Sequence, residues 1–180
     1  VADNRAIDDN SVAITFDDGY LGVKEYAEPI LNRYGYPATV FIAADYIDRK
    51  ASSGHYWLTW DFMRWEEIAS LKGISVGAHS LSHRRLDMLS GEDVRREVAG
   101  SKDIIAKKTG KGVTLFSYPH GGVVDAVKAA VRQAGFIGGC SSEGGANTNT
   151  TDRYCIRRTE ITAFDTTVRK FRKKLFGCYD

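Results

Sequence analysis

The sequence SVAITFDDG, which spans residues 11–19, begins with a β-branched run and ends in two adjacent carboxylates and a glycine. Residues 11–16 predict a strand, because β-branched and aromatic side chains suit a pleated, partly buried surface. Apolar side chains at helical spacing then run over residues 19–34 and stop at Gly35. This stretch therefore predicts a strand followed directly by a helix.

The same alternation of strand and helix continues along the chain. Further strands are predicted at 38–43, 74–78, 113–118, 136–140 and 154–162, and further helices at 61–72, 90–109, 123–134 and near the C-terminus. Thr59 is expected to cap the 61–72 helix, while Ser90 and Gly110 bound the next one. Such alternation predicts an α/β fold with a parallel sheet, either doubly wound or a barrel, and the spacing favours the barrel.

Composition limits the size and the partners of the protein. With 180 residues and 43% hydrophobic content, the chain can bury one sizeable core, so we expect a single domain over residues 1–180. The formal charge of +2 arises from 25 basic and 23 acidic residues, which does not imply a nucleic-acid partner. The basic stretch 169–174 is interpreted as the solvated face of a terminal helix.

Neither a membrane span nor a metal-binding cysteine pattern is found in the sequence. No window reaches the roughly 20 apolar residues that a transmembrane helix needs. Cys140, Cys155 and Cys178 lack paired zinc-site spacing, and either a Cys140–Cys155 bridge or three thiols is compatible with them. The chain does not begin with methionine, so any signal segment would lie upstream of it.

The unusual polar residues follow the predicted strands. Asp17 and Asp18 end the first strand, His79 ends the third, and Pro119-His120 ends the fourth. In parallel α/β folds the carboxyl ends of the strands form the edge at which ligands bind. We therefore expect these residues to converge.

His79 and His83, four positions apart, can chelate one divalent ion if a carboxylate supplies a third ligand. Either Asp18 or Asp17 can do so. An isolated pair of this spacing is more often an ordinary polar pair near a turn. Asp-Asp-Gly is likewise a common turn signal. Neighbouring residues of an extended segment point to opposite sides, however, so one aspartate can bind metal while the other accepts a proton.

The residues Thr15-Phe16-Asp17-Asp18-Gly19, together with His79-Ser80-Leu81-Ser82-His83, resemble the polysaccharide deacetylase family, also called carbohydrate esterase family 4 or the NodB-like domain. Phe116-Ser117-Tyr118-Pro119-His120-Gly121 matches its third motif, and the likeness extends over residues 11–175. The resemblance implies a distorted (β/α) barrel with fewer than eight complete units.

The same resemblance implies the roles of individual residues. Asp18, His79 and His83 would bind one divalent metal, Zn²⁺ in the first place and Co²⁺ or Ni²⁺ as alternatives. Asp17 would be the general base in the hydrolysis of an acetamide, and the backbone N–H at His120 would meet the oxyanion. Contacts to the sugar are expected from Tyr118, Pro119 and Trp60.

Two departures from the family pattern concern catalysis. Ser117 stands where many members carry an arginine that pairs with the base, and Arg158 is our candidate substitute. No histidine follows His120 to act as general acid, a pattern that resembles the branch deacetylating bacterial exopolysaccharides of the poly-N-acetylglucosamine type. The acid would then come from an upstream segment, from His120, or from Asp17 returning its proton. His55 is interpreted as a loop residue.

Three functions are compatible with these residues. The first is a hydrolase that removes acetyl groups from a polymer or oligomer containing N-acetylglucosamine, which would act outside the cytoplasmic membrane. The second is a metal- and carbohydrate-binding module without activity, and the third is a metal-dependent amidase for a small molecule. The loops 44–59 and 141–152 would distinguish an open groove from a closed pocket.

Overall fold

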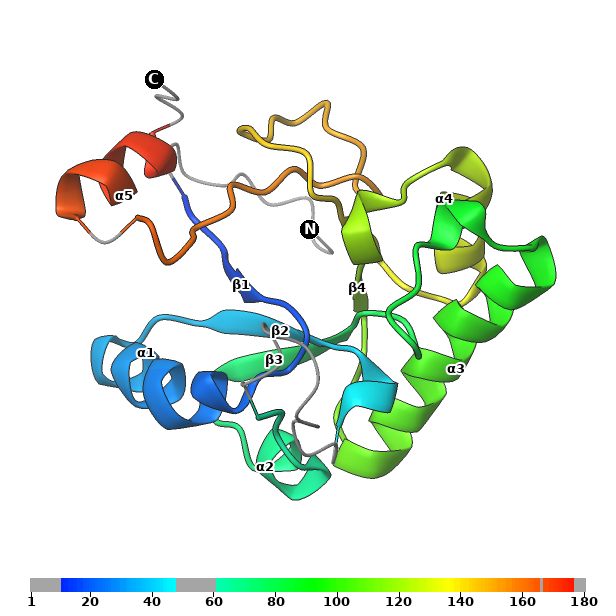
Figure 1. The fold of residues 1–180 in the computed structure, drawn as a ribbon, viewed down its shortest axis with the longest axis horizontal. Helices are drawn as coiled ribbons and strands as arrows, with labels where there is room; N and C mark the ends of the chain where they lie inside the picture. Colours follow the sequence, from blue (N-terminus) through cyan, green and yellow to red (C-terminus); the bar gives the residue numbers. More distant parts are fainter. Residues whose placement is uncertain (1–10, 48–60, 166, 177–180) are drawn as a thin grey trace.

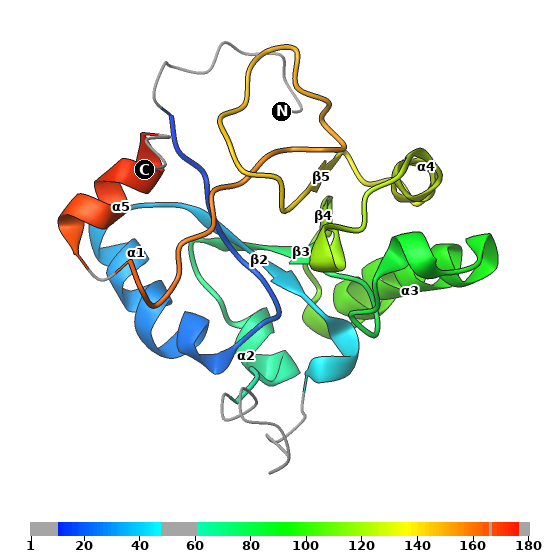
Figure 2. The same cartoon turned by 45° about the horizontal axis from the view of Figure 1, so that its top comes forward.

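A computed structural model describes residues 11–47, 61–165 and 167–176 of the chain. Five parallel strands form one sheet in the order β1-β2-β3-β4-β5. Their bounds are Ile14–Phe16 (β1), Ala38–Ile42 (β2), Ile74–Ala78 (β3), Leu115–Ser117 (β4) and Gly138–Cys140 (β5). The sheet curls, and its helices lie around the outer side (Figure 1 and Figure 2). The predicted incomplete barrel is confirmed.

Sequential strand order separates a barrel from a doubly wound sheet. In a doubly wound sheet the order of the strands reverses at a switch point, whereas here each strand pairs with the one before it in sequence. Right-handed crossovers between such neighbours place every helix on the same face of the sheet. The longest ladder joins β2 to β3 over five residue pairs, from Ala38↔Ile74 to Ile42↔Ala78.

The helices differ from their predicted bounds where local signals conflict. The helix predicted from Gly19 is a π-helical turn, Val23–Ala27, followed by α1, Glu28–Tyr34. Pro29 at the start of α1 cannot donate to an earlier carbonyl, which favours a wider turn before it. Gly35 ends α1 with φ 69°, as its position predicts.

Among the later helices, α3 agrees best with its prediction. It runs over Gly91–Thr109, with the Ser90 side chain accepting from Asp93 N and Gly110 at φ 68°. By contrast, α2 covers only Trp65–Ala69, and the Glu67 side chain accepts from Arg64 N at 2.7 Å at its start. Thr59, the expected cap, lies outside the described residues. The remaining helices are α4, Asp125–Gln133, and α5, Val168–Leu175, which buries no residue.

The predicted sixth strand is wrong. In the region 154–162 only Ile156 pairs with the sheet, through one parallel bridge to Cys140. After this bridge the chain leaves β5 and crosses toward β1, where Arg158 contacts Thr15 at 3.3 Å (Figure 2). The segment therefore spans the open side of the sheet without extending the ladder.

A continuous apolar core fills the space between sheet and helices. Val40 and Ile42 of β2 are fully buried, as are Ile68, Val98 and Ile105 on the covering helices. Cys140 is a buried free thiol and Cys155 a partly buried one, so the structure shows no Cys140–Cys155 bridge; Cys178 lies outside the described residues. No helix in the described part of the chain is long and apolar enough to cross a membrane.

Candidate active site

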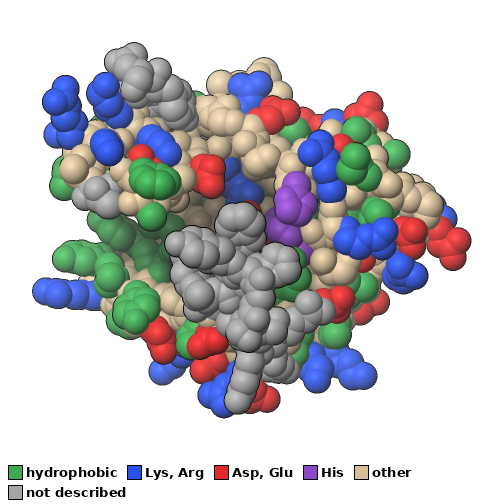
Figure 3. Space-filling model, in the orientation of Figure 1, with side chains coloured by type: hydrophobic (Ala, Val, Ile, Leu, Met, Phe, Trp, Pro, Cys, Tyr) green, Lys and Arg blue, Asp and Glu red, His purple; other side chains and the backbone are tan. Residues whose placement is uncertain are grey.

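The residues expected to converge do so at the carboxyl edge of the sheet. Asp17 and Asp18 follow β1 directly, and His79 follows β3, held there by its N–H donating to Ile42 O at 2.8 Å. Histidine side chains reach the surface in the middle of the face drawn in Figure 3. The edge therefore gathers side chains that are 62 positions apart in sequence, Asp17 and His79, with Nε2 of His79 3.8 Å from Asp17 Oδ2.

Among the residues that the structure describes, four other than glycine adopt the left-handed backbone region, and all lie at this edge. They are Asp18 (φ 70°), Ser80 (φ 62°), His83 (φ 60°) and His120 (φ 55°). This conformation is unfavourable for L-residues and is concentrated where a structure fixes functional side chains. Gly19 follows at φ 88°, and a Cβ there would lie 3.1 Å from Ile42, so the turn after β1 requires glycine.

Asp18, His79 and His83 form a cluster that fits one divalent cation. His83 Nε2 lies 3.2 Å from His79 Nε2 and 3.1 Å from Asp18 Oδ1, and His79 Nε2 lies 3.6 Å from the same oxygen. Bonds of about 2.0–2.1 Å in tetrahedral geometry separate zinc ligands by roughly 3.3 Å. The three atoms therefore have the spacing of a tetrahedral site with one open position.

The unpartnered oxygen of Asp18 supports this assignment. Asp18 Oδ1 is buried and makes no hydrogen bond with any residue that the structure describes, although His83 approaches it. Burial raises the pKa of Asp18, but the approach of His83, the charge of His79 and a hydrogen bond from Tyr20 lower it further than burial raises it. A buried, ionised oxygen without a donor is well suited to bind a cation.

His79 is oriented as a ligand by its other ring nitrogen. Nδ1 donates to Ser117 O at 2.7 Å, so Nε2 carries the lone pair that faces Asp18 and His83. Burial lowers the pKa of His79 more than the two aspartates raise it, which keeps the imidazole neutral. Both effects favour a metal-binding tautomer.

Asp17 is held by a different partner. Arg158 donates from Nη1 to Asp17 Oδ1 and from Nη2 to Oδ2, both at 2.7 Å. Nη2 also donates to the Ser117 hydroxyl at 2.9 Å, and that hydroxyl lies 3.3 Å from Asp17 Oδ2. The small side chain of Ser117 leaves room for a guanidinium from another part of the chain. Arg158 thus contacts Asp17 through two parallel hydrogen bonds, the bidentate geometry that suits a guanidinium and a carboxylate.

The charge state of Asp17 follows from this contact. Burial raises the pKa of Asp17, but the hydrogen bonds from Arg158 and the charges of His79 and Arg158 lower it below its ordinary value. The carboxylate is therefore ionised at neutral pH. Its oxygens border the cation cluster without belonging to it.

His120 lies next to the cluster but outside it. Its exposed ring packs at 4.6 Å from that of His83, and its Nε2 lies 3.2 Å from His83 O. The residue follows β4 in a short 3₁₀ turn, Pro119–Gly121. Because His120 has a left-handed backbone, the peptide groups of this turn are not aligned as they are in a regular helix.

Two of the expected sugar-contacting residues are corrected by the structure. Tyr118 is 1% exposed, its ring packs on Phe116, and its hydroxyl donates to Tyr154 O at 2.8 Å. Pro119 is buried as well. Because both side chains are buried, neither can stack on a sugar. Trp60 and His55 lie outside the described residues.

Sequence reasoning missed two tyrosines beside the cluster. Tyr20 hydrogen-bonds to Asp18, and burial together with the Asp18 charge raises the pKa of Tyr20 to about 12. Tyr46 packs its ring 5.4 Å from that of His83. Tyr20 directly follows the Asp-Asp-Gly turn, and this adjacency could have identified it.

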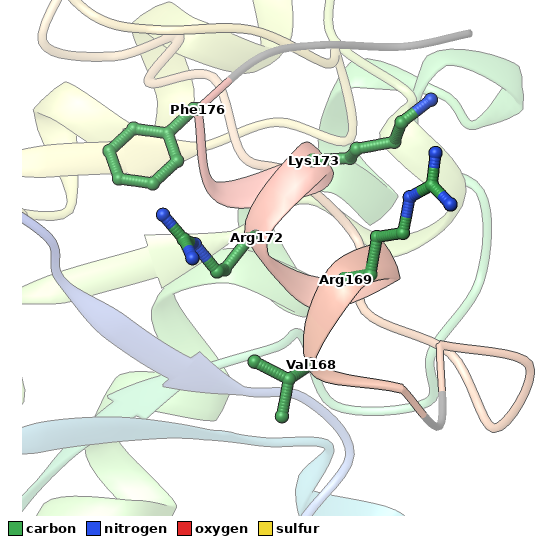
Figure 4. A pocket seen from close by; sticks show the side chains of 5 residues that line it. All are labelled: Val168, Arg169, Arg172, Lys173 and Phe176. Carbon is green, nitrogen blue, oxygen red and sulfur yellow. The ribbon is translucent and has the colours of Figure 1, made fainter.

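A separate hollow of about 440 Å³ lies along α5 (Figure 4). Val168, Arg169, Arg172, Lys173 and Phe176 line it, and none of them contributes to the cluster. The chemistry is therefore assigned to the carboxyl edge of the sheet, where the carboxylates and imidazoles meet.

Comparison with known families places these residues in context. The sequence matches the polysaccharide deacetylase family over residues 4–138, three quarters of the chain. The chain belongs to the polysaccharide deacetylase family. Asp17, Asp18, His79, His83 and His120 all fall within the matched region, whereas Arg158 lies beyond it.

Individual relatives agree with this membership. The chain is 32% identical over 150 residues to the putative polysaccharide deacetylase YxkH of Bacillus subtilis. This match covers 83% of the present chain and 51% of YxkH. The chain thus spans about half the length of this curated relative.

Solved structures show the same fold. The deacetylase PplD of Streptococcus pyogenes superposes with a TM-score of 0.80 at 19% identity, covering 97% of this chain and 74% of that one. The deacetylase domain of BpsB from Bordetella bronchiseptica superposes with a TM-score of 0.72 at 21% identity, covering 81% of this chain and 69% of the BpsB chain.

Proposed function

We propose that this chain is a metal-dependent hydrolase that removes N-acetyl groups from a polysaccharide or oligosaccharide containing N-acetylglucosamine. The observation that carries the proposal is an ionised carboxylate, Asp17, paired with Arg158 at the border of the Asp18–His79–His83 cluster. A binding protein needs ligands for its metal but has no use for a second, unliganded base. Membership of the polysaccharide deacetylase family supports the same reaction class.

In the proposed mechanism, the chain supplies ligands, a base and a donor. Asp18, His79 and His83 would hold the ion, which when bound polarises the acetyl carbonyl and acidifies a water molecule. Asp17 accepts the proton of the attacking water, and Arg158 keeps this carboxylate ionised and oriented. When the C–N bond breaks and acetate leaves, the sugar nitrogen takes up a proton, which Asp17 returns or which His120 or an upstream segment supplies. The backbone N–H at His120 would donate to the oxyanion, an interaction typically worth about 3 kcal/mol.

The metal is proposed to be Zn²⁺, with Co²⁺ and Ni²⁺ as alternatives. Two imidazoles and one carboxylate suit all three ions, and availability usually selects among them. Because a polymer substrate of this kind is extracellular or periplasmic, we propose that the protein acts outside the cytoplasmic membrane. The exopolysaccharide branch is favoured by the third motif, Tyr118-Pro119, and by the lack of a histidine in residues 121–180.

Acetate release will test the proposed reaction. We expect zinc-loaded protein to release acetate from N-acetylglucosamine oligomers, and excess chelator to abolish the release until zinc is restored. A small cyclic amide serves as the control substrate and should not react. Zinc binding without acetate release would instead support a binding module, and hydrolysis of the cyclic amide alone would support a small-molecule amidase.

Arg158→Met is expected to slow the reaction and to change its pH dependence. The hydrogen bonds and charge of Arg158 lower the pKa of Asp17, so their loss raises that pKa and leaves less ionised base at a given pH. The acid limb of kcat/KM should therefore move to higher pH, as measured by acetate release across a pH series.

The neighbouring exposed Arg157 provides a matched control. Its side chain lies 3.7 Å from Glu143 and does not contact Asp17, so Arg157→Met should keep the wild-type pH profile. An unchanged rate and pH profile in Arg158→Met would refute the supporting role of Arg158.

A further inference from the structure

The segment between the two histidine ligands is held in an unfavourable conformation. Ser80 and His83 both have positive φ, 62° and 60°, although neither is glycine. Such residues persist only where surrounding contacts determine them. The contacts that fix residues 80–83 determine where the His83 side chain points, and therefore whether its Nε2 completes the cluster with Asp18 and His79.

Glu97 of α3 makes the contacts that fix this segment. Its Oε2 accepts from Leu81 N at 3.0 Å and from Ser82 N at 2.9 Å. Its Oε1 accepts from the Ser82 hydroxyl at 2.5 Å. Three of the donors between the two ligands therefore converge on a single carboxylate.

Other contacts complete the support from the opposite side. Ser80 O accepts from Ala44 N at 3.2 Å, and Leu81 O accepts from Asp45 N at 2.8 Å. Within the segment, the Ser80 hydroxyl accepts from His83 N at 2.9 Å. The carbonyls are thus held by the chain after β2, whereas the N–H groups of residues 81 and 82 are held by Glu97.

The position of Glu97 indicates a specific role. The side chain is 3% exposed on the buried face of α3, next to Val98 and one turn from Val94. Its three hydrogen bonds come from neutral donors, two of them backbone N–H groups. A buried carboxylate is costly unless its hydrogen bonds are well satisfied, and removing it would leave two partly buried N–H groups without this acceptor.

We propose that Glu97 is a positioning residue that sets the affinity of the protein for its divalent metal. Its carboxylate is not one of the cluster's ligands. It acts by holding residues 81–82 so that His83 faces Asp18 and His79. The inference rests on the proposed function only in requiring that Asp18, His79 and His83 bind a metal.

Zinc affinity of the folded apo protein provides the test. Competition with a chromophoric chelator, without substrate, should show about tenfold weaker zinc binding in Glu97→Gln, because bonds to a neutral amide replace charge-assisted ones. Glu97→Leu removes all three acceptors and should weaken binding up to about 100-fold. Asp103→Asn removes an exposed carboxylate from the same helix and should bind zinc as the wild type does.

Two further readouts separate positioning from a merely structural role. Saturating zinc should restore the kcat of Glu97→Gln close to the wild-type value, whereas limiting zinc should not. A structural residue would instead lower the unfolding midpoint of the apo protein and leave the zinc dissociation constant of the folded protein unchanged. Wild-type affinity in folded Glu97→Gln would overturn the inference, whether or not Glu97→Leu folds.

The same measurement distinguishes this inference from the proposed function. If the wild type binds zinc and Glu97→Gln binds it equally well, only the role of Glu97 is wrong. If the wild type binds no divalent metal, the proposed function fails and the inference fails with it. If zinc binds and depends on Glu97 but no acetate is released, the metal site stands and the reaction does not.

Discussion

Asp17→Asn is expected to reduce acetate release by about 100- to 10,000-fold while zinc remains bound. Asparagine has nearly the same shape as aspartate but cannot accept a proton from water at neutral pH. Asp18, His79 and His83 keep their ligand atoms in this variant, so the metal site is preserved. Zinc content and acetate release, measured on the same preparation, will separate the loss of the base from the loss of the metal.

Asp45→Asn is the matched control for this prediction. Asp45 is an exposed carboxylate that follows β2 at the same edge of the sheet, and we assign it no catalytic role. Its replacement should leave the rate unchanged. Full activity in Asp17→Asn would show that another group accepts the proton, and zinc loss would show that Asp17 also supports the metal.

His83→Asn is expected to weaken zinc binding by more than the roughly 10- to 100-fold that loss of an outer partner costs. Asparagine tolerates the left-handed backbone of this position, φ 60°, so the change removes the ligand with little added strain. Asparagine is not among the usual zinc ligands. Competition with a chelator will give the dissociation constant.

His120→Asn offers the same substitution in the same backbone conformation. His120 has φ 55° and packs against His83, but it lies outside the cluster. It should therefore retain zinc. Equal zinc loss in both variants would mean that packing between the two rings, and not ligation by His83, holds the metal.

The two neighbouring aspartates show how one short turn creates two chemical environments. Asp18 meets His83 and Tyr20 and leaves one buried oxygen without a donor. Asp17 meets a guanidinium on both oxygens. The left-handed φ of Asp18 rotates the backbone between the two side chains, so a ligand and a base can follow each other directly in sequence.

Sequence alone determined the features that depend on neighbouring residues. Ser90 and Gly110 act within one turn of α3, so both ends of that helix were predicted correctly. Alternating strands and helices predicted a parallel sheet, and a parallel sheet brings the carboxyl ends of its strands to one edge. The convergence of Asp18, His79 and His83 follows from that rule, although their roles stay predictions.

Tertiary structure alone decided the features that depend on distant residues. Arg158 was only a candidate partner for Asp17, named because Ser117 replaces the family arginine, and the fold alone shows that its side chain, 141 positions later in sequence, meets both oxygens of Asp17. Tyr118 directly follows β4, and only the packing of Phe116 and Tyr154 around it shows that its ring is buried. The region 154–162 has strand-forming composition, yet it pairs through Ile156 alone. A strand needs a partner along its length, and the chain here turns toward β1, because burial and pairing are set by the whole fold and not by local propensity.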